Sequence, residues 1–195
     1  PPFRASQLFE WYYKKGQGDF MKMNNLPISL REKLSSLFKN PLWKEQVQCS
    51  QDGETTKFLW KLEDNALVES VLIEAPGRKT VCVSSQVGCP ARCAFCASGK
   101  EGLIRNLSAI EIAEQVFAID RVLKEKGERV SHVVFMGMGE PLDNYEAVMS
   151  SIQMICDEKR LGISERKVTV STVGIVPQIM RFTDDDIGVH LVLSL

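Results

Sequence analysis

Three cysteines that could bind a metal stand close together, at Cys89, Cys93 and Cys96. Three thiolates on one short loop can hold three irons of a 4Fe-4S cluster, and the fourth iron is then left without a protein ligand. An iron with an open position can bind a substrate, and such a cofactor supplies chemistry that side chains lack. The Cys-x3-Cys-x2-Cys spacing therefore predicts an iron–sulfur site of this open kind.

Two other kinds of cysteine site fit part of the pattern. A structural zinc needs four ligands in a tetrahedron, and no fourth Cys or His follows Cys96 within the length of a loop. Cys82 precedes the group but lies on a predicted strand. A disulfide framework is typical of short secreted chains, whereas this chain has 195 residues. The spacing favours the iron–sulfur cluster, with zinc as the main alternative.

The composition is that of a soluble globular protein, with 44% hydrophobic residues and a net charge of -1. No segment has the length of a membrane span and no signal-peptide pattern is present, so we expect a cytoplasmic, monomeric protein with no membrane partner. Residues 1–48 carry eight basic and four acidic side chains, a net +4, which leaves -5 on the rest. Aromatic residues interleave with these charges, so the stretch is interpreted as RNA-facing or as a solvated helix surface.

Apolar periodicity divides the chain into three regions. Residues 1–48 are predicted to form a small helical domain, with one helix over 4–15 and a second that opens at a capping box over 29–32. Residues 49–78 are predicted to form a linker and a β-hairpin. In residues 79–195, strands are expected at 80–84, 130–136, 167–172 and 187–195, with helices at 108–127, 144–160 and 176–182. The first of these helices opens at a capping box over 108–111. This α/β pattern predicts the first part of a (βα) barrel, with about four of its strands present.

The ends of the chain favour a fragment of a longer protein. It begins at Pro1 without Met, and residues 192–195 have the pattern of a buried strand. Buried strand ends seldom coincide with a natural terminus.

Further motifs follow the predicted barrel strands. Gly137 and Gly139 would let the backbone approach a ligand, and the carboxylate of Glu140 could receive an ammonium group. Residues 171–174 follow the third strand, and the fourth ends at Ser194. Because reacting groups in α/β barrels collect at the carboxyl ends of the strands, we expect these motifs to share one edge with the cysteine loop.

Four segments together carry a resemblance to a known family. They are 81–89 (VCVSSQVGC), 102–107 (GLIRNL), 137–142 (GMGEPL) and 171–174 (STVG). The chain resembles, over nearly its whole length, the radical S-adenosylmethionine (SAM) RNA methyltransferases of the RlmN type. These enzymes methylate carbon 2 of adenine in 23S rRNA and in tRNA.

The resemblance implies a 4Fe-4S cluster, SAM and an electron donor such as flavodoxin. By matching positions, Cys89, Cys93 and Cys96 hold the cluster, Gly139, Glu140, Ser171, Ser194 and Leu195 contact SAM, and Glu69 is the proton acceptor. From the residues alone, Glu69 would be interpreted as an exposed hairpin carboxylate.

Cys82 has two interpretations. A cysteine that alternates with valines on a strand is usually an inert core residue. In the family, a methyl group is first carried on a cysteine near the C-terminus. The residue that matches Cys82 then resolves the protein–RNA adduct and ends in a disulfide with that first cysteine. Neither Cys49 nor Cys156 matches the methyl carrier, so we expect these 195 residues alone to be inactive.

Two further functions stay open at this point. One is the related methylation of carbon 8 of the same rRNA adenine, which confers antibiotic resistance, although the Val87 context favours the carbon-2 enzymes. The other is a zinc-stabilised RNA-binding module.

Overall fold

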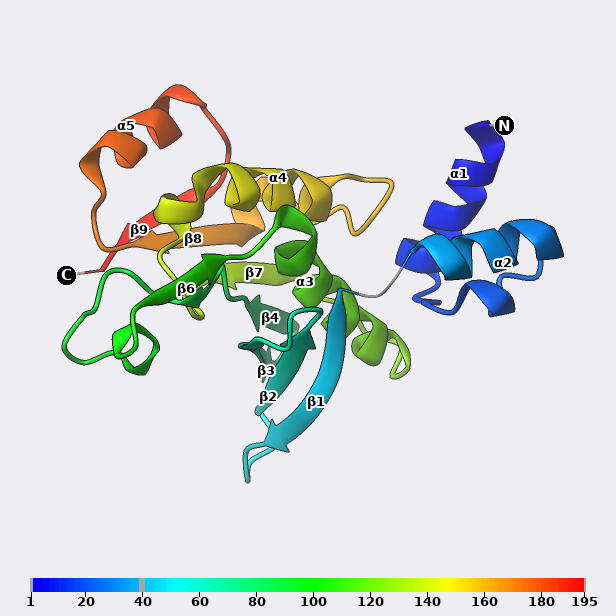
Figure 1. Cartoon of the computed structure of the whole chain (residues 1–195), viewed down its shortest axis with the longest axis horizontal. Coiled ribbons are helices and arrows are strands. Elements are labelled where there is room, and N and C mark those ends of the chain that lie inside the picture. Colours follow the sequence, from blue (N-terminus) through cyan, green and yellow to red (C-terminus); the bar gives the residue numbers. More distant parts are fainter. Residues whose placement is uncertain (1, 39–40, 195) are drawn as a thin grey trace.

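A computed structural model describes residues 2–38 and 41–194 (Figure 1). The helices are α1 (Pro2–Phe9), which continues as a π-helical turn over Glu10–Lys14, α2 (Ile28–Leu37), α3 (Ala109–Lys124), α4 (Tyr145–Cys156) and α5 (Val176–Asp184). The strands are β1 (Leu42–Cys49), β2 (Thr55–Leu62), β3 (Leu67–Ala75), β4 (Arg78–Cys82), β5 (Gln86–Gly88), β6 (Leu103–Asn106), β7 (His132–Phe135), β8 (Val168–Thr172) and β9 (His190–Leu193). None of the described helices combines the length and the apolar character that crossing a membrane requires.

Seven strands form one sheet in the order β1-β2-β3-β4-β7-β8-β9 (Figure 1). The first four are antiparallel neighbours, and β4, β7, β8 and β9 are parallel. Helices α3, α4 and α5 connect the successive parallel strands, as parallel pairing requires. The predicted α/β fold, with four strands of a partial barrel, is confirmed.

The two faces of the sheet differ in burial. Val81, Val133 and Val168 are fully buried in a core that also contains apolar side chains of α3 and α4. Cys82 and Val134, which alternate with these valines, are only half-buried. Because successive side chains of a strand point to opposite faces, the face that carries Cys82 is open. We call it the open face.

The N-terminal helices follow the prediction except at one cap. Residues 4–15 are helical as far as Lys14, but the capping box expected over 29–32 is wrong. Helix α2 begins at Ile28, and the carbonyl oxygen of its N-cap residue, Pro27, accepts the N–H groups of Leu30 and Arg31. Ser29 therefore lies inside the first turn, where its side chain cannot cap.

Three strands were absent from the sequence prediction. Strand β1 was missed because a bulge between Lys44 and Gln46 breaks its alternation of apolar and polar residues. Strands β5 and β6 are too short for a periodic signal, with three and four residues. The predicted hairpin is present as β2 and β3, but it continues into the barrel strands through β4.

Residues 83–86, which run from the end of β4 to the first residue of β5, form a buried junction rich in polar groups. All four are at most 1% exposed. The N–H groups of Ser85 and Gln86 both donate to the carbonyl oxygen of Met138, at 2.8 and 3.2 Å. Gln115 of α3 accepts the Ser84 N–H and donates to the Ser84 carbonyl oxygen, each at 2.9 Å. The junction thus ties β4 to a helix and to the loop after β7.

We predict that Gln115→Leu destabilises the fold, because the leucine has similar size but leaves the N–H and C=O groups of Ser84 unpaired. Each unpaired buried group costs about 1–3 kcal/mol. The matched control is Gln153→Leu on the exposed side of α4, where a change within about 0.5 kcal/mol is expected. Urea unfolding of both variants measures the difference, and equal midpoints would contradict the role given to Gln115.

Candidate functional site

The three cysteines lie on the connection between β5 and β6, which pair as a separate antiparallel hairpin (Figure 1). Cys89 is buried, whereas Cys93 and Cys96 are half-buried. The N–H of Cys89 donates to the carbonyl oxygen of Gly102 at 3.1 Å and closes the base of the loop. The side chain of Phe95, just before the last cysteine, is 84% exposed.

Glycine is required where the two ends of the cysteine loop meet. Gly88 has φ +75°, and a Cβ there would lie 2.0 Å from the carbonyl oxygen of Gly102. Backbone atoms cannot yield at that distance, so any side chain at position 88 would push the two ends of the loop apart.

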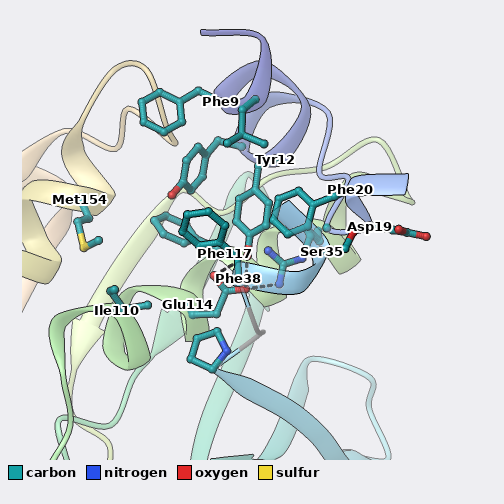
Figure 2. Close-up of a pocket in the computed structure, with 15 residues that line it drawn as sticks. Phe9, Tyr12, Asp19, Phe20, Ser35, Phe38, Ile110, Glu114, Phe117 and Met154 are labelled. Carbon is teal, nitrogen blue, oxygen red and sulfur yellow. Dashed lines mark hydrogen bonds and ion pairs between the residues drawn. The ribbon is translucent and has the colours of Figure 1, made fainter. Parts of the chain in front are cut away.

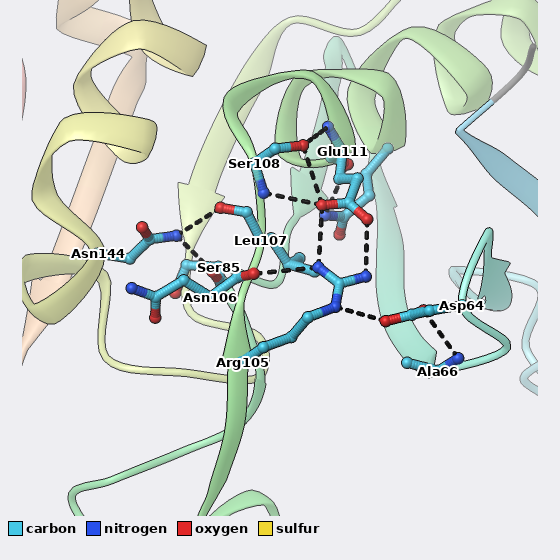
Figure 3. A network of polar contacts seen from close by, with 10 residues as sticks. Asp64, Ala66, Ser85, Arg105, Asn106, Leu107, Ser108, Glu111 and Asn144 are labelled. Atoms are coloured by element: carbon cyan, nitrogen blue, oxygen red, sulfur yellow. Dashed lines mark hydrogen bonds and ion pairs between the residues drawn. The ribbon is translucent and has the colours of Figure 1, made fainter.

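Arg105 of β6 anchors the hairpin to two other elements (Figure 3). Its Nε donates to Asp64 in the turn between β2 and β3 at 2.6 Å. Its two Nη atoms donate to the carboxylate of Glu111 on α3, at 2.8 and 3.1 Å. Glu111 and Ser108 also form the predicted capping box of α3, which is confirmed.

These contacts keep the Glu111 carboxylate ionised. Burial alone would raise the pKa of Glu111, but hydrogen bonds from Arg105 and Ser108 outweigh it, and the pKa is lowered. A bidentate arginine–carboxylate pair has a fixed planar geometry. Arg105 therefore holds the base of the cysteine loop in one orientation against α3.

The turn after β7 packs tightly on the 83–86 junction. Gly139 has φ +107°, and a Cβ there would lie 2.6 Å from Ser85 Oγ and 2.7 Å from Gln86 Cβ. The N–H of Gly137 donates to the carbonyl oxygen of Val83 at 3.0 Å. The sequence predicted that these glycines let the backbone approach a ligand. In the structure they let it approach the 83–86 junction.

Glu140 is 3% exposed, and its carboxylate links two loops. One oxygen accepts the N–H of Leu142 at 3.0 Å, and the other accepts the N–H of Val173, in the loop after β8, at 2.9 Å. A carboxylate has about four acceptor positions, so capacity for another donor is left. Glu140 is thus held in place by backbone groups and can still accept from a ligand.

Ser171 of β8 and Ser194, just after β9, meet at the same edge of the sheet. Their hydroxyl oxygens are 3.0 Å apart, and the Ser194 N–H donates to the carbonyl oxygen of Thr172 at 2.8 Å. Leu195, also predicted to contact SAM, lies outside the described residues.

Cys82 and Glu69 share the open face. Val71, which lies two residues beyond Glu69 on β3, pairs directly with Cys82. The Glu69 carboxylate pairs with Lys57 Nζ at 3.0 Å, and within the described residues no hydrogen bond joins Glu69 to Cys82. Burial raises the pKa of the Cys82 thiol, so this thiol stays protonated at neutral pH.

The cysteine loop has suitable donors but an open arrangement. Within residues 2–38 and 41–194, no three His, Cys, Asp or Glu side chains converge closely enough to hold a metal ion. All three cysteines are free thiols, and the residues between them are exposed or half-buried, so the loop can close without disturbing the core. Soft thiolates suit iron–sulfur clusters and zinc alike. The donor set fits a cluster.

The junction contributes one more polar group to this edge. Ser85 Oγ is buried, has no hydrogen-bond partner within the described part of the chain, and lies against Gly139. A buried hydroxyl without a partner is unusual in folded proteins. Among the residues predicted to bind SAM, Gly139 packs directly on this hydroxyl.

Four residues that organise this edge were not singled out from the sequence. They are Ser84, Gln86, Gln115 and Asn144, all buried. The detectable signal was in α3, where Gln115 is one of three polar side chains, with Glu114 and Asp120, among the buried apolar residues. A buried polar side chain needs a partner, but the sequence does not say which.

A cavity of about 570 Å³ lies elsewhere, between the N-terminal helices and α3 (Figure 2). Six of its fifteen lining residues are aromatic, and none of them is a predicted site residue. Glu114, 3% exposed, accepts the Tyr12 hydroxyl at 3.1 Å and pairs with Arg121. Burial, together with the charge of Glu114, raises the pKa of Tyr12. The contact attaches the N-terminal helices to the barrel.

Two family models match the chain. Residues 1–39 match the ribosomal RNA large subunit methyltransferase N-terminal domain, and residues 83–189 match the radical SAM superfamily.

Individual relatives match over the whole chain. A probable dual-specificity RNA methyltransferase RlmN 2 from Protochlamydia amoebophila is 54% identical over an aligned length of 195 residues. The alignment covers 99% of this chain and 54% of the relative. A probable dual-specificity RNA methyltransferase RlmN from Corynebacterium diphtheriae is 46% identical, with 100% of this chain and 54% of the relative covered. The crystal structure of a radical SAM methyltransferase from Sphaerobacter thermophilus superposes with a TM-score of 0.96 at 42% identity, covering 100% of this chain and 57% of that one. The chain spans about half the length of the curated relatives it matches.

We predict that Gly139→Ala is more damaging than alanine at another glycine with positive φ. Gly53, with φ +75° and no atom within 4 Å of the position that a Cβ would occupy, is the matched control. Backbone strain of about 1–2 kcal/mol applies to both variants. Overpacking against the junction adds about 1–3 kcal/mol at position 139 only. Urea unfolding compares them, and an equal loss of stability would show that the junction tolerates a side chain there.

Proposed function

Because this chain belongs to the radical SAM superfamily, we propose that it is the cluster-binding and SAM-binding part of an RNA methyltransferase. The proposed reaction methylates carbon 2 of an adenine in 23S rRNA and in tRNA through a methyl-cysteine intermediate. One observation carries this proposal. The Gly139–Glu140 turn and the Ser171–Ser194 pair lie at the carboxyl edge of the parallel strands, and the junction that leads into the cysteine loop packs on the same turn.

The superfamily implies a 4Fe-4S cluster and SAM. When bound, the cluster supplies one electron that splits the SAM sulfonium into methionine and a 5′-deoxyadenosyl radical. The residues that would hold the cluster are Cys89, Cys93 and Cys96, and those that would contact SAM are Gly139, Glu140, Ser171, Ser194 and Leu195.

At this edge, the residues of the protein are proposed to bind and orient SAM. Two backbone N–H groups fix the Glu140 carboxylate, so it can receive the ammonium group of SAM without a change of rotamer. Because Gly139 has no side chain, the turn can lie against the junction and leave room for the ligand on its other side. Preorganised groups of this kind lose little entropy on binding.

Cys82 and Glu69 are proposed to act on the RNA adduct at the open face. As a thiolate, Cys82 would attack the sulfur of the methyl-carrying cysteine in the protein–RNA adduct, so that a disulfide forms while the bond from that sulfur to the RNA-bound carbon breaks. The electron pair of the broken bond stays with that carbon, which takes up a proton and becomes the methyl group of the released RNA. Since the Cys82 thiol is protonated at neutral pH, the attack needs a base or a substrate that lowers its pKa. Glu69 is proposed as the acceptor of the proton from the adenine. Cys49 is exposed at the end of β1 and Cys156 closes α4, so the methyl-carrying cysteine is expected outside this chain.

The predicted N-terminal domain, residues 1–48, is proposed to face RNA, with its helical part over α1 and α2 and its last residues, from Leu42, in strand β1. Its net charge of +4 and the match of residues 1–39 to an rRNA methyltransferase domain support this role. Residues 49–78 would link it to the barrel, which begins at about residue 79. We further propose a cytoplasmic monomer that receives its electron from a donor such as flavodoxin.

Product analysis tests the reaction. Full-length enzyme, reduced under anaerobic conditions, is incubated with SAM and with rRNA or tRNA, and the digested nucleosides are identified by mass spectrometry. We expect 2-methyladenosine. If 8-methyladenosine forms instead, the related carbon-8 activity is correct, and a protein that contains zinc and methylates nothing would be the RNA-binding module.

Cys82→Ala in the full-length protein should retain the cluster and still cleave SAM, because Cys82 is not one of the three loop cysteines. It should then accumulate protein covalently joined to RNA, since only release needs the Cys82 thiol. Denaturing gels with labelled RNA would show a nuclease-sensitive shifted band. Cys156→Ala is the control and should show no such band. Normal release of methylated RNA by Cys82→Ala would mean that Cys82 is only a core residue.

A further inference from the structure

The open face of the sheet is basic, although the whole chain has a net charge of -1. The strand register places three cationic side chains on it, Lys57, Lys61 and Arg78, together with His132 and His190. Glu69 is the carboxylate that the register assigns to this face, and Glu45 lies in the bulge of β1, where the register gives it no partner. A face with this bias favours a polyanionic partner over an acidic or a neutral one.

Trp43 of β1 is an exposed aromatic residue on the same face. It alternates with Leu42, which is 1% exposed, and its own side chain is 43% exposed. In the β1–β2 register, Trp43 lies directly opposite Lys61. Paired residues of antiparallel strands share one face and have Cβ atoms about 5 Å apart. The indole and an ammonium group are therefore neighbours.

Lys61 is free to bind an anion. Lys57, four residues before Lys61 on β2, already forms an ion pair with Glu69, at 3.0 Å. Within residues 2–38 and 41–194, no carboxylate lies within ion-pair distance of Lys61. An aromatic platform beside an unpaired lysine is the combination that binds single-stranded nucleic acid, because bases stack on the ring and phosphates approach the cation.

This surface is continuous with the residues proposed to act on the adenine. Lys61 pairs with Leu67, which lies two residues before Glu69 on β3, and Val71 of the same strand pairs with Cys82. From strand spacing and rise per residue, Trp43 and Cys82 are ~20 Å apart across the sheet. A few nucleotides of extended RNA can bridge that separation.

We propose that Trp43 and Lys61 form a binding surface for the single-stranded RNA that flanks the target adenine. Trp43 stacks on an unpaired base and Lys61 contacts a phosphate. This inference rests on the proposed function, since it assumes that the base at Cys82 belongs to RNA. It assigns a role in RNA binding to the antiparallel strands outside the barrel, independently of the N-terminal helices.

The test measures binding of the full-length protein to a fluorescein-labelled RNA hairpin whose loop contains adenine, by fluorescence anisotropy. Loss of one stacked base should weaken binding by about 5- to 100-fold in Trp43→Ala. Trp43→Phe keeps a ring and should recover most of the affinity. Lys61→Glu should weaken binding. Because one phosphate contact is lost, the slope of log Kd against log salt concentration should fall by about one.

Lys126→Glu, which reverses an exposed charge just beyond the end of α3, is the matched control and should change binding less than twofold. Normal binding by both Trp43→Ala and Lys61→Glu would overturn this surface while leaving the proposed function intact. Failure of the unmodified chain to bind RNA at all would instead count against the proposed function. A change from dimer to monomer in Trp43→Ala with unchanged RNA affinity would assign the face to a second copy and also overturn the proposal.

Discussion

The arrangement of the site depends on the need to pair the backbone polar groups of residues 83–86 without water. These residues are at most 1% exposed, so their N–H and C=O groups must find partners inside the protein. The partners come from separate elements. Met138 and Gly137 lie in the turn after β7, Gln115 lies on α3, and Asn144 precedes α4. Satisfying one buried segment therefore fixes the positions of three others.

The same junction connects the two halves of the proposed chemistry. Ser84 Oγ donates to the backbone carbonyl oxygen of Glu69 at 2.6 Å and accepts the N–H of Met138 at 2.9 Å. The Glu140 N–H donates to the Gln86 side chain at 2.8 Å. The strand with the proposed proton acceptor and the turn with the proposed SAM ligand are thus held by neighbouring residues. A rigid support of this kind keeps reacting groups in register.

The cysteine loop contrasts with this support. Its base is fixed by the Gly88–Gly102 approach and by Arg105, whereas the residues between Cys89 and Cys96 are mostly exposed. Few buried contacts constrain that stretch, so it can adjust around a cluster while the junction stays unchanged. The protein therefore combines a preformed ligand edge with a loop that closes on its metal.

The sequence predicted those features whose signals are local. A few neighbouring residues were enough to recognise the periodicity and capping box of α3. The same holds for the alternation in β2 and β3 and for the glycines beside Glu140. Strand β1 was missed because its bulge disrupts the alternation, and Ser29 was misplaced because Pro27 starts the helix earlier. Arg105 and Asp64 are 41 residues apart, and Gln115 and its partner Ser70 are 45 residues apart. Periodicity carries no information about such pairs.

Metal analysis tests most directly whether three thiols of one loop bind an iron–sulfur cluster. The 195-residue chain is reconstituted with iron and sulfide under anaerobic conditions, together with Cys93→Ala and, as the control, Cys49→Ala. We predict about four irons and four sulfides per chain in the unmodified protein and in Cys49→Ala, with loss of both in Cys93→Ala. One zinc per chain without sulfide, or an iron content unchanged by Cys93→Ala, would contradict the cluster assignment.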